Sequence, residues 1–494
     1  MTQNSLLQDY DLAHLAIDLI RQSSCEYGEI RICQYRNQRL SAQDYSLKNL
    51  SDNVSSGFGI RLLWRGSWGF AASHRKTKQE ITRIISLAIE IARASNLSQK
   101  NPIRLAHTEA YRDTYITPIE IDPFVVPLDE KAELLMAINN GLLRFKGKGV
   151  KKAFSFLDFT REQKIFASTE GSLIDQTLYR SYPSFGCTVV DNGDAQSRKY
   201  ERHPLNKGYE YIDKKDLLNN IDRVAHEAIE KAKAPNGPTN CRSTLILKPT
   251  NLWLTIHESV GHPTELDRVF GYESNFAGTS FATIDKLGKL QYGAPWINFV
   301  ADRTQKDGRS TVGYDDEGVK TDSWHLVKDG LLVDYLTDRE TAYRLGRSHS
   351  NGCAYADSWS SVPMVRIPNL GLEPGKPNAS NTATLEQMIE NTKDGILIDG
   401  DGSFSIDQQR RNFQFGGDAF WKIKNGKIAG MLKNVTYQSM TTDFWNSIDA
   451  IGTESELEQC GTNNCGKGEP IQVAQMTHSC VPIRAQNIQI GRAH

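Results

Sequence analysis

Just past the middle of the chain, residues 254–268 read Leu254-Thr255-Ile256-His257-Glu258-Ser259-Val260-Gly261-His262-Pro263-Thr264-Glu265-Leu266-Asp267-Arg268. Two imidazoles and an adjacent carboxylate are the groups needed to hold a Lewis-acidic metal ion and to deprotonate its bound water. The apolar residues 252–256 in front of them are typical of a buried helix, which would carry the pair into the interior. This stretch is therefore the first candidate for chemistry.

The spacing of the two histidines predicts a distorted helix. In the common zinc-protease pattern the histidines stand at i and i+4 and share one helix face. Here the second stands at i+5, and five steps of about 100° leave His262 roughly 140° from His257 on an ideal helix. A π-turn with i→i+5 bonding would realign them. Gly261 permits a close backbone approach and Pro263 disfavours continuation of the helix, so we expect a metal site on a distorted or terminating helix.

Two histidines are too few for a catalytic zinc, which usually takes three protein ligands. With 11 histidines in 494 residues, chance alone would give this motif in roughly 1 to 2 of 100 such chains. Glu265 and Asp267 are nearby candidates for a third ligand. The C-terminal segment offers softer ones, namely Cys460, Cys465, His478 and Cys480. Cys465 lies among glycines that permit a tight turn, as a thiolate ligand on a loop would require.

Several stretches together resemble the TldD/PmbA family of zinc metallopeptidases. The run from His257 to His262 is similar to the His-Glu-x-x-x-His signature of the metal-bearing TldD side of that family. The other matching stretches, in order, are Thr311-Val312-Gly313-Tyr314-Asp315-Asp316-Glu317-Gly318, Pro363-Met364-Val365-Arg366-Ile367-Pro368-Asn369 with Pro374-Gly375, Asn412-Phe413-Gln414-Phe415-Gly416-Gly417-Asp418, and Cys465-Gly466-Lys467-Gly468. The resemblance covers about 250–490, and the N-terminal half is similar only in layout.

This resemblance implies a zinc-dependent peptidase. His257, His262 and the Cys465 thiolate would bind Zn2+, and Glu258 would act as general base. Cys465 ranks before Cys460 and Cys480 because it alone has the Cys-Gly-Lys context. The implied activity is hydrolysis of unfolded or extended peptides, for peptide turnover or for maturation of modified peptides. The alternative is a non-catalytic partner or scaffold subunit of a peptidase complex.

Composition limits the partners. The formal net charge is −1, and no basic cluster marks a nucleic-acid or anionic membrane surface. No apolar run approaches the ~20 residues of a membrane span, and the start lacks the layout of a secretory signal. Eight dispersed cysteines are typical of reduced thiols. We therefore expect a cytoplasmic protein acting on a peptide or unfolded protein. The resemblance implies a homodimer, or a heterodimer with a metal-free paralogue.

Hydrophobic periodicity predicts an α+β protein. Helical patterns at 8–23, 78–95, 129–143 and 214–234 alternate with strand patterns at 29–35, 153–160, 164–168 and 185–190. A hairpin is predicted to turn at Arg65-Gly66. Proline-rich stretches at 117–126 and 234–240 divide the chain into an N-terminal α+β lobe (1–120), a second α+β lobe (121–236) and a β-rich metallopeptidase domain (237–494). In the last, residues 328–330 and 424–426 are hairpin turns.

Two further features need an interpretation. The acidic run from Tyr314 to Gly318 is more typical of a solvated turn than of a cation site, because no EF-hand spacing follows it. A transition-state donor such as Tyr314 or Arg366 is possible, but the sequence does not choose between them, and the substrate-binding residues stay unassigned.

Overall fold

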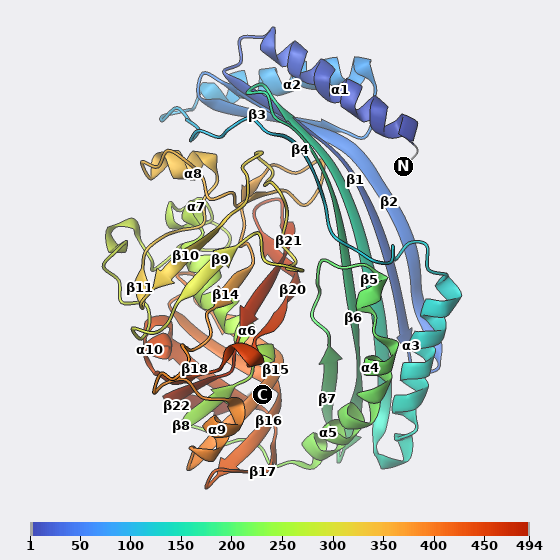
Figure 1. Ribbon diagram of the computed structural model, residues 1–494, viewed down its shortest axis with the longest axis vertical. Helices are drawn as coiled ribbons and strands as arrows, with labels where there is room; N and C mark the ends of the chain where they lie inside the picture. The colour runs from blue at the N-terminus through green and yellow to red at the C-terminus, as the bar shows by residue number, and fades with distance from the viewer. Residues whose placement is uncertain (1–2, 493–494) are drawn as a thin grey trace.

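A long curved sheet and a β-rich domain face each other in the structure, a computed structural model that describes residues 3–492 (Figure 1). The N-terminal half forms the sheet and its covering helices, and the C-terminal half lies against the concave side of the sheet. The fold is α+β, as predicted. Within residues 3–492, no helix is both long enough and apolar enough to cross a membrane.

The N-terminal sheet has the strand order β3-β2-β1-β5-β6-β4, with β7 also beside β6. All its pairs are antiparallel except β4 with β6. The strands are β1 (Tyr27–Gln43), β2 (Ser46–Trp64), β3 (Ser67–Ser73), β4 (Arg112–Ile116), β5 (Val150–Ser168), β6 (Leu173–Asp191) and β7 (Asp194–Glu201). The predicted hairpin at Arg65-Gly66 is confirmed, since Trp64 pairs with Ser67.

The sequence predicted much shorter strands, at 29–35, 153–160, 164–168 and 185–190. The predicted strands are shorter than the observed ones because the alternation of apolar and polar residues is lost where polar side chains are buried. Glu162, which lies in the gap between two of the predicted strands, is 1 % exposed inside β5, and Glu29 near the start of β1 is 1 % exposed as well. Their charges are paired within the sheet, so the strands continue through positions that read as solvent-facing.

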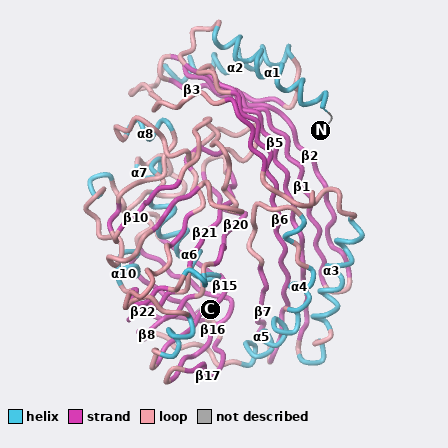
Figure 2. The backbone as a smooth tube through the Cα atoms, in the orientation of Figure 1, coloured by secondary structure: helices cyan, strands magenta, loops and turns pink. Residues whose placement is uncertain are grey.

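Five helices cover the two ends of this sheet (Figure 2). They are α1 (Gln3–Arg21), α2 (Lys78–Asn96), α3 (Leu128–Leu143), α4 (Lys214–Asn219) and α5 (Ile221–Lys233). The apolar face predicted for α2 is buried against the sheet, with Ile81, Ile84 and Ala88 almost inaccessible. The single helix predicted at 214–234 is two helices, because the helix is interrupted at Asn220.

Strands from both sides of the predicted boundary at residue 120 belong to this one sheet. β1 pairs with β5 along 15 positions, from Glu29 with Ser168 to Gln43 with Phe154. The predicted linker at 234–240 lies between α5 and β8, the first strand of the C-terminal half. The division into three domains stays a prediction.

The C-terminal half is built on a ring of strands. Its strands follow the order β15-β8-β22-β18-β16, and β16 pairs in turn with β15, which closes the ring. The strands of this half are β8 (Cys241–Leu247), β9 (Phe299–Asp302), β10 (Ser323–Lys328), β11 (Leu331–Leu332), β12 (Ala354–Tyr355), β13 (Met364–Val365), β14 (Leu370–Leu372), β15 (Asp394–Ile406), β16 (Asn412–Lys424), β17 (Lys427–Leu432), β18 (Val435–Met440), β19 (Ile448–Ile451), β20 (Glu458–Lys467), β21 (Gln472–Cys480) and β22 (Ile483–Arg492). Its helices are α6 (Pro249–Ile256), α7 (Leu266–Val269), α8 (Arg339–Arg344), α9 (Leu385–Glu390) and α10 (Thr441–Asn446).

Both predicted hairpin turns of this half are confirmed. Asp329-Gly330 joins β10 to β11, and Asn425-Gly426 joins β16 to β17. All four residues have positive φ, between 48° and 75°. Positive φ at both central residues is the signature of the type I′ turn that suits antiparallel strands.

The interpretation of residues 314–318 as a solvated turn is wrong. Asp315, Asp316 and Glu317 are each 2 % exposed. Lys164 of β5 pairs with Asp316 at 2.5 Å, and Arg61 of β2 pairs with Glu317 at 2.8 Å. The acidic run therefore ties the C-terminal half to the long sheet. The sequence could not reveal this, because the cations stand about 150 or more positions earlier in the chain.

Candidate metal centre

The predicted π-turn is present. Helix α6 continues into a π-helical turn at His257–Gly261, where the N–H of His262 donates to the carbonyl of His257. This i→i+5 bond brings the two imidazole rings to 4.7 Å between centroids. A Cβ on Gly261 would lie 2.8 Å from Ile367 Cδ1, so only glycine allows this turn to pack so closely. The helix ends in a 3₁₀ turn at His262–Thr264 that contains Pro263.

The structure brings His257, His262 and Cys465 together. One potential ligand atom from each lies within 4.8 Å of the others, and all three residues are buried. Cys465 Sγ is 3.5 Å from His262 Nε2. Zinc bonds of about 2.1 Å to nitrogen and 2.3 Å to sulfur at a tetrahedral angle would separate two such ligands by roughly 3.5 Å. The three side chains therefore fit a common divalent ion.

Cys465 lies on a strand rather than on the predicted loop. It belongs to β20, whose register against β21 shifts between Thr462 and Cys465. This register shift lets the backbone of β20 depart from regular strand geometry next to Cys465, as the flanking glycine had indicated. The competing thiols do not join the group: Cys480 donates weakly to the carbonyl of Pro249 instead, and burial raises the pKa of its thiol well above the usual value.

His478 fixes the orientation of the His257 ring through the nitrogen that does not face the other ligands. Its Nδ1 lies 3.2 Å from the carbonyl of Leu370, which can only accept, so this nitrogen carries the proton. Its Nε2 must then accept from Nδ1 of His257, at 2.8 Å. His257 is thus held in the tautomer that leaves Nε2 with a free lone pair. Burial lowers the pKa of both residues, which favours neutral imidazoles.

Glu265 performs the same task for His262. Its Oε2 lies 2.7 Å from Nδ1 of His262, which again leaves Nε2 available. Burial opposes ionisation of Glu265, but Lys467 and His262 outweigh it and hold its pKa well below the usual value. The fully buried Lys467 ammonium also pairs with Asp267 at 2.8 Å. Glu265 and Asp267, considered from the sequence as ligands, therefore lie behind the ligand group in this network.

The electrostatic surroundings favour a thiolate at Cys465. Burial alone would raise the pKa of its thiol, but His262 and Arg366 lower it overall. Two neutral imidazoles and a thiolate are a donor set suited to a borderline-soft divalent metal. Most ligating histidines have their second nitrogen bonded to a carboxylate or another acceptor, and both histidines here do.

Glu258 faces away from this support network. Its carboxylate pairs with the guanidinium of Arg410, at the turn between β15 and β16. The side chains of Glu258 and Arg410 are 7 % and 14 % exposed. Glu258 adjoins His257 in the sequence and lies outside the ligand group, so it stays a candidate general base.

Both candidate transition-state donors already hold other hydrogen bonds. The hydroxyl of Tyr314 donates to Asp113 at 2.6 Å. The guanidinium of Arg366 donates to the backbone carbonyls of Gln472 and Cys465. Arg410 was not anticipated, since nothing in the sequence near residue 410 links it to Glu258, 152 positions earlier.

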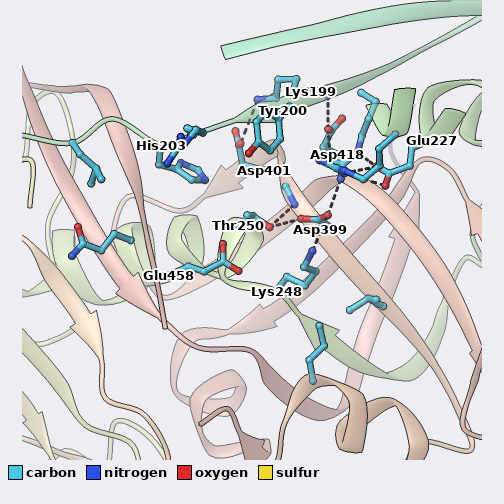
Figure 3. Close-up of a pocket in the computed structure, with 18 of the residues that line it drawn as sticks. Lys199, Tyr200, His203, Glu227, Lys248, Thr250, Asp399, Asp401, Asp418 and Glu458 are labelled. Carbon is cyan, nitrogen blue, oxygen red and sulfur yellow. Dashed lines mark hydrogen bonds and ion pairs between the residues drawn. The ribbon is translucent and has the colours of Figure 1, made fainter. Parts of the chain in front are cut away.

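A cleft of about 850 Å³ separates β7 and α5 from the C-terminal half (Figure 3). Its lining is rich in both charges, for example Lys199 and Glu227 on one side and Lys248 and Asp399 on the other. No member of the ligand group lines it. Ring contacts link the two sites, because His203 in the cleft meets Trp253 edge to face and Trp253 stacks on His478. Strand β20 also runs from the cleft, at Glu458, to Cys465.

Comparison with known proteins agrees with this site. The PmbA/TldA metallopeptidase C-terminal domain matches residues 240–489, and domain 1 and the central domain of the same family match 28–92 and 121–234. The chain belongs to the PmbA/TldD metallopeptidase family. The predicted resemblance is therefore confirmed, and it extends to the N-terminal half.

Relatives of this family member carry metalloprotease names. A metalloprotease of Methanocaldococcus jannaschii is 28 % identical over 91 % of this chain and 94 % of its own length. A TldD homolog of Buchnera aphidicola is 25 % identical over 98 % and 96 %. A Thermotoga maritima protein, described as a candidate modulator of a DNA gyrase, has a crystal structure that covers 98 % of this chain and 100 % of its own, with 16 % identity and a TM-score of 0.77. That last likeness concerns the fold.

Proposed function

We propose that this chain is a zinc-dependent peptidase that hydrolyses unfolded or extended peptides, for peptide turnover or for maturation of modified peptides. The observation that carries the proposal is the convergence of His257, His262 and Cys465, with the second nitrogen of each imidazole already bonded. The metalloprotease names of the relatives support it.

Zinc suits this donor set better than harder cations. Imidazole and thiolate ligands favour zinc, whereas magnesium and calcium prefer oxygen. Three protein ligands leave one coordination position open, as in catalytic zinc sites. A zinc ion held here would polarise a peptide carbonyl and bring the pKa of a bound water to near 7.

Glu258 is the proposed general base. It would take the proton from the attacking water and later pass it to the leaving amine. Arg410 holds the Glu258 carboxylate in one orientation in the peptide-free protein. The positive charge of Arg410 also serves as the counter-charge of the buried Glu258 carboxylate.

An extended peptide is proposed to lie along the open edge of β20. Among residues 3–492, β20 pairs only with β21, so its other edge has no strand partner. Addition of a peptide to such an edge binds main chain without reading much sequence. Six strand steps, roughly 20 Å at about 3.3 Å each, separate Gln459 at the cleft from Cys465. The cleft would therefore receive residues of the peptide distant from the scissile bond.

Zinc content and peptidase activity of the purified full-length chain test the proposal together. We expect close to one zinc per chain and cleavage of a mixed library of unstructured peptides. A chelator should abolish cleavage and added zinc should restore it. Equal cleavage by the zinc-free protein would contradict the proposal. A zinc-loaded protein that cleaves no peptide of the library would favour the scaffold alternative.

Glu265→Gln is expected to weaken zinc binding by about 10- to 100-fold, the range typical of lost support for a ligating histidine. The amide is nearly isosteric but carries no charge to orient Nδ1–H of His262 or to balance Lys467. Competition with a chromogenic chelator measures the affinity. Glu469→Gln, an exposed carboxylate near the end of β20, is the control and should bind as the wild type does. An unchanged affinity in Glu265→Gln would contradict this role.

A dimer, with a second copy or with a metal-free paralogue, is proposed to cover the outer half of β2. Residues 46–56 of β2 pair only with β1 in the part of the chain that the structure describes. Leu47, Leu50 and Val54 on this stretch are 40 %, 49 % and 60 % exposed. Open, apolar strand edges favour pairing with another chain. Light scattering should give twice the chain mass for the wild type and a lower mass for Leu50→Lys/Val54→Lys. If the wild-type chain is monomeric alone and also stays monomeric when mixed with the paralogue, the dimer proposal is contradicted.

The cytoplasm is the proposed location, supported by the dispersed free thiols, all eight of which are unpaired with one another.

A further inference from the structure

A small cationic cavity lies between the long sheet and the C-terminal half, on the far side of Ile367 from the metal centre. It has a volume of about 20 Å³ and is lined by β5, β6 and β21, which face each other in Figure 1. Five of its lining residues are cations and one is an acid: Lys164, Arg180, Arg303, Arg309, Arg366 and Asp316.

Two of the five cations are balanced by carboxylates. Lys164 pairs with Asp316 at 2.5 Å and with Glu162 at 2.9 Å. Arg180 pairs with the other oxygen of Glu162 at 2.8 Å. The two carboxylates are thus fully used by these two cations, and neither offsets the remaining arginines.

Within residues 3–492 the other three arginines have no carboxylate within ion-pair distance, and of the three Arg366 alone faces the Cys465 thiolate. Arg303, Arg309 and Arg366 are 4 %, 2 % and 1 % exposed, and the Nε of each is buried without a hydrogen-bond partner. Arg309 reaches only a carbonyl at 3.4 Å. Asp158 attracts Arg309 without forming an ion pair. Buried charges left without a counter-charge are strongly destabilising, so the arrangement favours a bound anion.

The guanidinium of Arg309 stays charged despite its burial. Burial lowers the pKa of Arg309 to about 9, which is still above neutral pH. Burial raises the pKa of Asp315, the acid near Arg303, to about 7, so at neutral pH this carboxyl offsets the charge of Arg303 only in part. The excess positive charge of the cavity therefore persists at neutral pH.

We propose that this cavity binds one small monovalent anion of about the size of chloride. A space of about 20 Å³ is enough for one ion of the size of chloride or for one water. Leu178, Val312 and Ile367 line it between the cations, and such apolar walls strengthen the attraction between the charges. The site does not depend on the proposed peptidase activity. Because Arg366 also donates to the carbonyl of Cys465, the anion would stiffen the strand that carries this thiol.

Bromide, which replaces chloride and scatters anomalously, tests the site directly. Wild-type crystals grown with sodium bromide should give an anomalous peak among the three guanidinium groups. In solution, replacing gluconate by chloride at constant ionic strength should raise the melting temperature by a few degrees, with saturation. Sodium acetate in a third series tests the size limit, because a rise with acetate but not with chloride would overturn the assignment to a chloride-sized ion.

Arg309→Met removes one unpaired charge while keeping the length of the side chain, and should abolish the anion-dependent rise. Arg144→Met, at an exposed arginine paired with Asp222, should keep the wild-type rise. If Arg309→Met does not fold, the wild-type crystals and melting series still decide. Absence of the bromide peak, or a peak in crystals without any anion-specific rise in solution up to 200 mM, would mean an adventitious ion only and would overturn the proposal.

Discussion

Glu258→Gln is expected to lower kcat by about 10²- to 10⁴-fold while zinc content stays at the wild-type level. The fold-change is that typical of a lost general base. Glutamine has nearly the same shape but cannot accept the proton of the attacking water. Because Glu258 lies outside the ligand group and contacts Arg410 instead, its replacement should leave the metal in place. Peptide cleavage at saturating substrate and zinc analysis of the same sample measure the two effects.

Glu469→Gln serves as the matched control, because it makes the same change at a solvent-exposed carboxylate that contacts Asn275. Its kcat should equal that of the wild type. Wild-type turnover in Glu258→Gln would remove this residue from the mechanism. Loss of zinc in Glu258→Gln would instead indicate that the carboxylate supports the metal.

The sequence predicted the metal helix well because its geometry leaves few choices. Two histidines at i and i+5 can share a face only through a π-turn, and Gly261 with Pro263 marks where that turn can form. The family resemblance, rather than spacing, placed Cys465 ahead of Cys460 and Cys480. The periodicity of α2 and the turns at Asp329-Gly330 and Asn425-Gly426 also depend on local chemistry, and they too were predicted.

The parts that were missed depend on contacts between distant segments. Residues 314–318 read as a solvated turn because their cations, Lys164 and Arg61, lie on strands of the other half. His478 was considered a possible ligand, whereas it fixes the tautomer of His257. Arg410 has no local pattern that points to Glu258. Long-range charge pairing leaves no periodic trace in the sequence, so only the folded chain reveals it.

Cys465→Ala is expected to weaken zinc binding by more than about 100-fold. Loss of a residue that merely orients a ligand costs 10- to 100-fold, so loss of a ligand should cost more. Alanine removes the thiolate and leaves only the two imidazoles. Arg366 would also lose the negative charge that it faces, which adds to the imbalance. Zinc per chain after dialysis against a weak chelator measures the effect, and His262→Ala should show a loss of the same order.

Cys480→Ala and Cys460→Ala are the matched controls, since both thiols are buried on the same hairpin but neither belongs to the ligand group. Both variants should keep wild-type zinc. Burial keeps Cys480 protonated, and a thiol is a poor ligand until it loses its proton. Undiminished zinc in Cys465→Ala, combined with loss in Cys480→Ala, would move the third ligand to Cys480. That result would require the C-terminal end of β21 to turn toward the histidines, away from the carbonyl of Pro249 that it now contacts.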